Sequence, residues 1–219
     1  MEYGLGRIHV PDERDNKFPL SAKLPAKATD NTWKYWWADG WWGNQGHTEQ
    51  CTAYGWMHWV SDGPIKHPKD KSPVEDPASF YAKEQAIDGL PQPHQGSTVR
   101  AGAKILQEQG YVLSYHWAQN IEDVKTCLLT TGPLVVGTAW SMDMFQPDAN
   151  GVIHPTGANV GGHCYVLDGI NVGKGLLRIK NSWGKSWGNN GFAYISITDF
   201  GNLLDAYGEA CLAVENPNI

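Results

Sequence analysis

A cysteine and an amide side chain in the stretch NQGHTEQC are the first residues of this sequence that could act together on a substrate. Gln45 lies six residues before Cys51, and apolar residues at i, i+3, i+4 and i+7 from Ala53 to Val60 predict an amphipathic helix that begins at the cysteine. A thiol in the first turn of a helix has a lowered pKa, because the unpaired N–H groups and the helix dipole favour an anion. Cys51 is therefore a candidate nucleophile, and a small buried apolar residue is the alternative interpretation.

A reactive thiolate needs a histidine for proton transfer and a third group that fixes the imidazole. Among the eight histidines, His163 opens a predicted strand in the stretch GGHCYVLDG, directly after two glycines. Glycines in a strand let another backbone or a ligand approach closely. The residue after it, Cys164, must point to the opposite face of that strand and is interpreted as a core residue. Taken alone, His163 also fits a hydrogen-bonded structural histidine.

The stretch IKNSWGKSWGNNGF follows this strand after one turn and supplies the third group. From Asn181 onward it resembles the Asn-Ser-Trp-Gly-x-x-Trp-Gly-x-Asn-Gly-aromatic run of the papain-like cysteine peptidases. The resemblance implies that Asn181 orients His163 and that Trp183 shields their contact from water. It also implies that Gln45 stabilises an oxyanion together with the backbone N–H of the nucleophile, since an Asn-Gln-Gly turn precedes the cysteine in that family.

The same resemblance implies where a substrate would bind. A Gly-Gly pair that holds the substrate backbone in the family corresponds to Gly96 and Ser97, and Gly162 and Trp183 complete the expected substrate-binding residues.

The sequence also departs from the family pattern around the nucleophile. A structural cysteine of the family is replaced by Thr48, which excludes its disulfide, and the aromatic residue after the nucleophile is replaced by Thr52. These departures bear on specificity and rate more than on the type of reaction.

Helical patterns come first along the chain and strand patterns later, which is typical of an α+β fold. Helices are predicted to start at Cys51, at Asp76-Pro77, at Ser97 and at Asn120, and the last three end near Gly89, Gly110 and Gly132. The predicted strands are PLVVGTAW, HCYVLDGI, GLLRIKN, FAYISI and EACLAV. We expect a single two-lobed papain-like domain over residues 1–219. Residues 20–115 would form a helical lobe with the nucleophile, residues 116–219 an antiparallel β-barrel-like lobe with His163 and Asn181, and the terminal segments would cross between them.

Composition narrows the classes of partner. The 219-residue chain has a net charge of −6, which does not favour nucleic acid, and its apolar runs are too short to span a membrane. The N-terminal stretch lacks the pattern of a signal peptide, and the four cysteines show no metal-ligand spacing. We therefore expect a monomer in the cytoplasm, with an association with a phage or virus left open, that acts on a polypeptide substrate without a metal or cofactor.

The sequence favours a cysteine peptidase that hydrolyses peptide bonds through a thioester acyl-enzyme. Two alternatives remain. The chain could be a catalytically weak binding or virion-structural protein on the same fold, since a fold alone does not establish a function. It could also be a thiol amidase or acyltransferase that acts on a non-peptide substrate.

Overall fold

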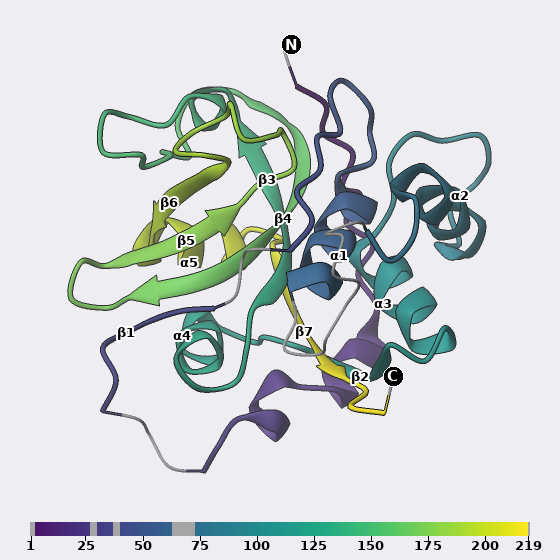
Figure 1. The fold of residues 1–219 in the computed structure, drawn as a ribbon, viewed down its shortest axis with the longest axis horizontal. Coiled ribbons are helices and arrows are strands. Elements are labelled where there is room, and N and C mark those ends of the chain that lie inside the picture. The colour runs from purple at the N-terminus through teal and green to yellow at the C-terminus, as the bar shows by residue number, and fades with distance from the viewer. Residues whose placement is uncertain (1–2, 27–29, 37–39, 63–72, 219) are drawn as a thin grey trace.

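The computed structural model describes residues 3–26, 30–36, 40–62 and 73–218. Its α-helices are α1 (Cys51–Asp62), α2 (Pro77–Ile87), α3 (Val99–Glu108), α4 (Ile121–Thr130) and α5 (Ile197–Asp205). Its strands are β1 (Trp33–Tyr35), β2 (Val112–Trp117), β3 (Leu134–Ser141), β4 (Asn159–Asn171), β5 (Leu176–Lys180), β6 (Phe192–Ser196) and β7 (Glu209–Glu215). Three 3-10 helices, η1 (Glu13–Lys17), η2 (Leu20–Lys23) and η3 (Met142–Phe145), complete the described elements. Figure 1 shows α1, α2 and α3 on one side of the molecule and β3 to β6 on the other.

The strands form one antiparallel sheet in the order β2-β7-β3-β4-β5-β6, and β1 pairs with β4 off this path. The sheet stays open between β2 and β6, so the barrel expected from the sequence is an open sheet. Its longest strand, β4, carries His163 and pairs with β3, β5 and β1. The two-lobed α+β architecture agrees with the expectation.

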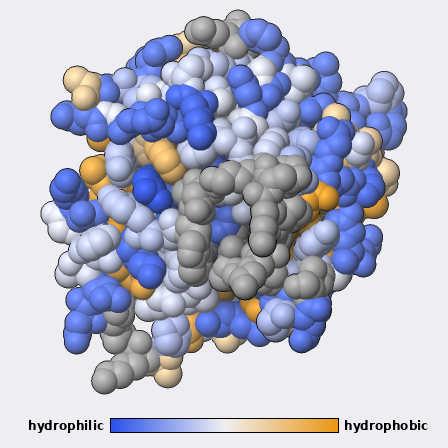
Figure 2. Space-filling view, viewed as in Figure 1, coloured by the Kyte–Doolittle hydropathy of each residue, from blue (hydrophilic) through white to orange (hydrophobic). Residues whose placement is uncertain are grey.

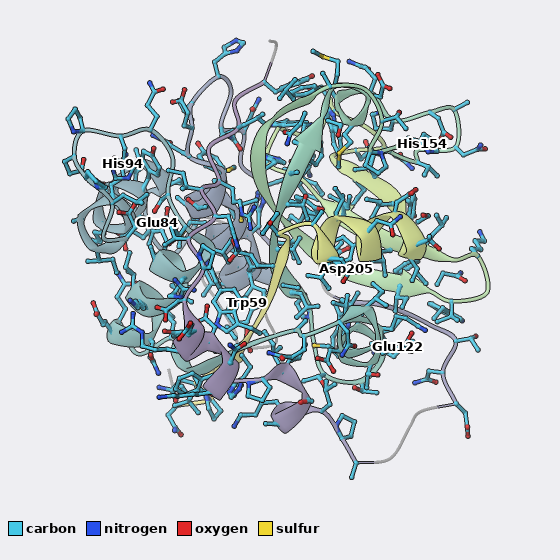
Figure 3. All side chains as sticks on the ribbon, turned by 180° about the vertical axis from the view of Figure 1, so that it is seen from behind. Trp59, Glu84, His94, Glu122, His154 and Asp205 are labelled. Carbon is cyan, nitrogen blue, oxygen red and sulfur yellow. The ribbon has the colours of Figure 1, made fainter. Side chains whose placement is uncertain are left out.

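Helix α1 lies at the contact between the helices and the sheet. Every residue of α1 except Tyr54 is buried, because α2 and α3 cover one side and β4 and β3 the other. Trp59 lies near the centre of the molecule in Figure 3, where its indole N–H donates to the carbonyl of Pro133 at 3.3 Å. The apolar positions that predict this helix therefore serve two neighbours at once, and the thiol at its start is held against the sheet.

Local capping explains where the other helices begin. Asp76 caps α2 by accepting from the N–H of Ser79, with Pro77 in the first turn, as predicted. Asn120 caps α4, also as predicted. Helix α3 is capped by Thr98 rather than Ser97, because the Thr98 hydroxyl accepts from the N–H of Ala101. The predicted start is thus one residue early.

The five predicted strands are present as β3 to β7, whereas β1, β2 and α5 were not predicted. Strand β2, with the sequence VLSYHW, mixes polar and apolar residues without clear alternation. Helix α5 follows β6 without a break and contains Gly201, which weakens a helical pattern.

Two groups of buried side chains form the core. One joins the sheet to α4 and α5, and the other joins α1, α2 and α3 to the opposite side of β3, β4 and β7. Figure 2 shows that hydrophilic residues cover most of the visible surface that is not grey, with apolar residues in small separate patches. The tryptophans that crowd between Trp33 and Trp42 do not behave as one group. Trp41 and Trp42 pack on α1, but Trp33 is largely exposed and Trp37 lies outside the described residues.

All four cysteines are buried and free. Within the described ranges, no helix is long and apolar enough to cross a membrane.

Two helical glycines give a matched test of this packing. A Cβ on Gly102 of α3 would lie 2.0 Å from the Trp56 ring, whereas one on Gly201 of α5 would meet only Ile121 at 3.6 Å. Gly102→Ala should therefore lower the free energy of unfolding by about 1–3 kcal/mol through overpacking. Gly201→Ala should raise it by up to about 1 kcal/mol through helix propensity. Urea unfolding of both variants measures the two changes, and equal effects would contradict this packing of α3 on α1.

Candidate active site

Cys51 is the first residue of α1 and is completely buried. Its side chain belongs to the same group of buried residues as Cys164, the residue after His163 on β4. The contact is close, because a Cβ on Gly55, one turn further along α1, would lie 2.9 Å from the Cys164 sulfur. A helix residue without a side chain thus lets α1 approach the strand that carries His163.

His163 and Asn181 form a buried pair. The imidazole Nε2 of His163 lies 2.8 Å from Oδ1 of Asn181, so this nitrogen carries the proton and donates it to the amide oxygen. The same oxygen accepts from the N–H of Ser182 at 2.8 Å, which fixes the orientation of the amide. The other ring nitrogen, Nδ1, is buried and has no hydrogen-bond partner among the described residues. The ring therefore presents an unpaired acceptor.

Aromatic rings enclose this imidazole. Trp183 stacks on the His163 ring at 4.6 Å with an interplanar angle of 22°, and Trp140 meets it edge-on at 4.8 Å. Burial among these groups lowers the pKa of His163 to about 4, although the hydrogen bond to Asn181 opposes the shift. His163 is therefore neutral at pH 7 in this arrangement.

The Cys51 thiol does not have the lowered pKa that the sequence predicts. Burial raises the pKa of Cys51 to about 12, against a smaller lowering by the backbone N–H of Cys164. The predicted lowering of this pKa is thus wrong for the arrangement seen here, because loss of solvent outweighs the helix N-terminus. Cys51 and His163 are both neutral, and the described residues show no hydrogen bond from the thiol to Nδ1 of His163.

A segment at the start of the chain, residues 3–9, lies against the turn that precedes Cys51, and we call it the N-terminal strap. In Figure 1 it runs from the top of the molecule along the boundary between the sheet and α1. The N–H of Gly4 donates to the carbonyl of Gly46 at 2.8 Å, and the indole N–H of Trp183 donates to the carbonyl of Gly4 at 3.1 Å. Tyr3 stacks on Trp183 with ring centroids 4.7 Å apart. The strap thus covers the expected site from the region before Cys51 to the tryptophan above His163.

Gln45 is held by this surrounding structure. Its Oε1 accepts from the hydroxyl of Ser182 at 2.6 Å, which directs the NH₂ group away from that contact. The NH₂ group lies 2.7 Å from the carbonyl oxygen of Thr48 and 3.2 Å from that of Gly4. The amide expected to stabilise an oxyanion therefore faces a carbonyl oxygen of the strap. Ser182 is an orienting residue that the sequence reasoning did not assign, although it lies inside the quoted NSWG motif.

The residues expected to bind a substrate backbone contact the strap instead. The carbonyl of Gly162 accepts from the N–H groups of Gly6 and Arg7, both at 3.0 Å. Ser97 donates its N–H to the carbonyl of Gly6 at 2.9 Å and accepts from the N–H of Ile8 at 2.8 Å. Gly96 directly precedes Ser97, and its N–H lies 2.6 Å from the hydroxyl oxygen of Tyr81.

Other histidines lie apart from this site. Figure 3 places His94 on the side of the helices and His154 on the side of the sheet. His94 pairs with Asp88 at 2.9 Å and His154 with Asp148 at 3.1 Å. His58, inside α1, is buried, and its Nε2 accepts from the N–H of Gly43 at 2.9 Å. His67 lies outside the described residues. In the part of the chain that the structure describes, no group of histidine, cysteine and acidic residues could hold a metal ion.

Comparison with known proteins identifies the family to which the sequence is similar. The model of the papain family cysteine proteases matches residues 53–205. This range includes His163 and Asn181, but it begins two residues after Cys51, so the segment with Gln45 and the cysteine lies outside the match.

Individual relatives are distant. A cathepsin B-like cysteine proteinase 5 of Caenorhabditis elegans is 31% identical over 81 residues, which cover 36% of this chain and 24% of that protein. The uncharacterized peptidase C1-like protein L477 of Acanthamoeba polyphaga mimivirus is 21% identical over 192 residues, which cover 68% of this chain and 62% of that protein. The chain thus spans less than two thirds of the length of these relatives.

Solved structures share the fold over nearly the whole chain. The crystal structure of xylellain, a cysteine protease from Xylella fastidiosa, has a TM-score of 0.72 at 18% identity and covers 99% of this chain and 98% of its own. A digestive procathepsin L2 proteinase of Tenebrio molitor has a TM-score of 0.66 at 17% identity and covers 97% of this chain and 78% of its own. Since the family model matches residues 53–205 of the 219, the chain belongs to the papain family of cysteine proteases.

Proposed function

We propose that this protein hydrolyses peptide bonds through a thioester, with Cys51 as nucleophile and His163 as the group that moves protons. The observation that carries the proposal is the buried hydrogen bond between His163 Nε2 and Asn181 Oδ1, which leaves Nδ1 as an unpaired acceptor. The contact between the Cys51 sulfur and the backbone N–H of Cys164 brings the thiol to the strand that carries this acceptor.

The first half of the reaction forms the acyl-enzyme. Nδ1 of His163 takes the thiol proton of Cys51, and the sulfur attacks the carbonyl carbon of the substrate. The Nε2–H of His163 stays bonded to Asn181, which stabilises the imidazolium and keeps the ring in place. Negative charge develops on the carbonyl oxygen, where the amide of Gln45 and the backbone N–H of Cys51 would donate to it. His163 then returns the proton to the leaving amine, and the carbon–nitrogen bond breaks.

The second half releases the product. Neutral His163 removes a proton from a water molecule, which attacks the thioester carbonyl carbon. The carbon–sulfur bond breaks, the thiolate regains a proton from the imidazolium, and the carboxylic acid product leaves. Trp183 covers the His163–Asn181 bond and excludes water that would compete for it. The substrate in this proposal is a polypeptide, and monomeric state and cytoplasmic location stay predictions.

One observation favours a second candidate, a catalytically silent protein on this fold. Cys51 is completely buried, and the strap is bonded to Gly162 and Ser97, which are expected to bind a substrate. A silent protein would keep this arrangement permanently, whereas a peptidase must open it. Digestion of a quenched fluorescent peptide library by the protein, with Cys51→Ala as the control, separates the two candidates. Cleavage by the protein and none by the control supports the peptidase.

Two substitutions test the assignment of the pair. His163→Ala should lower kcat/KM by about 10²–10⁴-fold, the usual contribution of a general acid–base group. Asn181→Ala should lower it less, because the imidazole survives and only its orientation and charge stabilisation are lost. Steady-state kinetics on one library peptide measure both effects. Equal small losses would show that His163 is wrongly assigned.

Gln45→Ala tests the oxyanion role. Loss of one such donor should lower kcat by on the order of 10²-fold with KM nearly unchanged, because the interaction forms mainly in the transition state. The substitution also removes a bond to the strap, which would raise activity, so a fall in kcat cannot come from that effect. Unchanged kcat with a lowered free energy of unfolding would instead mean that Gln45 only braces the turn before α1.

A further inference from the structure

The backbone of the N-terminal strap is bound as a peptide would be. Gly162 holds it from β4, and Ser97 holds it from the turn before α3, so the strap bridges the two lobes. The bridge between Arg7 and Ser97 is parallel. An extended segment with hydrogen bonds on both sides occupies the space that a substrate backbone would need.

One side chain of the strap is buried in a pocket of the sheet. The Nε of Arg7 donates to Oε1 of Glu209 at 2.9 Å, and the two side chains are only 5% and 11% exposed. Nη2 of Arg7 donates to the carbonyl of Tyr207 at 2.8 Å and lies 2.8 Å from Nδ1 of His9. A guanidinium group is thus matched by a carboxylate and a carbonyl oxygen, an arrangement that suits its fork of donors.

The space for this side chain is built into the fold. Gly137 of β3 pairs with Glu209 of β7, and a Cβ on Gly137 would lie 2.7 Å from Nε of Arg7. A Cβ on Gly162 would lie 2.2 Å from the backbone oxygen of Arg7. Glycines on two neighbouring strands therefore leave room for a long side chain next to the carboxylate of Glu209. We call the space that the Arg7 side chain fills the Arg7 pocket.

The buried carboxylate of Glu209 needs a positively charged partner. Burial raises the pKa of Glu209, and the charge of Arg7 opposes this shift. The charge of Arg100 also acts on Glu209, but Arg100 is itself paired with Asp15. A buried carboxylate that loses its partner is strongly unfavourable. When the strap leaves, the pocket would therefore favour another positive side chain.

The Arg7 pocket lies next to Cys164, because Gly137 of the pocket pairs with Cys164 across β3 and β4. Cys164 belongs to the same group of buried residues as Cys51, and the charge of Arg7 acts on both cysteines. A substrate whose side chain filled the pocket would have its backbone on Gly162 and Ser97, beside the thiol.

We propose that the Arg7 pocket is the specificity pocket of this enzyme for an arginine or lysine side chain of a polypeptide substrate, and that the strap is its internal occupant. This inference rests on the proposed peptidase function. It deepens that function by naming the substrate class and the segment that must leave before a substrate binds. Arginine suits the pocket better than lysine, because two acceptors face the guanidinium group.

A glycine of the strap provides the release variant. The backbone of Gly6 has φ of +132°, and a Cβ there would lie 2.2 Å from the carbonyl oxygen of Glu49. Gly6→Ala should loosen the strap without altering the residues assigned to the reaction. Gly173→Ala, in the turn between β4 and β5, is the matched control, because its Cβ would meet only Asn171 at 3.6 Å.

The first readout is the alkylation of Cys51 by iodoacetamide at pH 7, mapped by mass spectrometry. Gly6→Ala should speed this reaction about 5- to 100-fold, since overpacking of this kind shifts the closed–open equilibrium by that factor. Gly173→Ala should react like the unaltered protein. Equal rates in all three would overturn the role of the strap.

The second readout tests the pocket without requiring catalysis. N-acetyl-arginine amide should slow the alkylation of Cys51 in Gly6→Ala, and the neutral isostere N-acetyl-citrulline amide should not. Equal protection by the two probes, or none by either, would overturn the pocket. This comparison leaves Glu209 unchanged, so it holds even where a variant of Glu209 fails to fold.

The third readout is hydrolysis. In the Gly6→Ala background, a peptide with arginine should be cleaved with a kcat/KM about 10- to 100-fold above that of its citrulline counterpart. Glu209→Gln should remove this difference while cleavage of a leucine peptide reports that the variant is folded. Cleavage without preference for arginine would overturn the pocket and leave the peptidase standing. Protection by arginine amide without cleavage of any peptide would support the pocket and refute the peptidase.

Discussion

The contact of α1 with β4 is the constraint on which the rest of the structure depends. Helix α1 is buried on nearly every side, and Gly55 lets it approach the Cys164 side of the strand. Because neighbouring residues of a strand face opposite ways, Cys164 can pack on the helix while His163 points toward Trp140 and Trp183. A single helix–strand contact therefore brings a thiol from one lobe to the strand of the other lobe that carries the imidazole.

The charge states of Cys51 and His163 follow from the exclusion of water. The same burial that protects the His163–Asn181 bond keeps both the thiol and the imidazole neutral. An ion pair of thiolate and imidazolium is expensive in such a site unless polar groups or water stabilise it. The strap lies against the turn before Cys51, so we expect the charge state of the thiol to change when the strap opens.

Much of the fold and of the candidate site could be predicted from sequence because the relevant patterns are local. The NSWG run, the turn before Cys51 and the caps at Asp76 and Asn120 each depend on a few neighbouring residues. Strand β2 was missed because its burial is set by pairing with β7, almost a hundred residues later. The raised pKa of Cys51 was missed because the burial of the thiol depends on residues far away in the sequence, such as Cys164.

Three strap residues illustrate this limit most clearly. Nothing local marks Arg7 as the partner of Glu209, since the two are separated by nearly the whole chain. In the sequence, Gly4 and Gly6 have no distinguishing pattern and resemble flexible residues of an extended segment. Glycine is required at both positions because a Cβ would clash with the backbone just before Cys51.

The covalent connection of the strap to the domain has a kinetic consequence. A tethered segment competes at an effective concentration that is typically on the order of millimolar, and dilution of the protein does not reduce it. A free peptide at micromolar concentration would therefore rarely displace it by mass action. Substrate capture would be gated by the opening rate of the strap, and the apparent affinity for substrate would be weakened by the fraction of molecules that are closed.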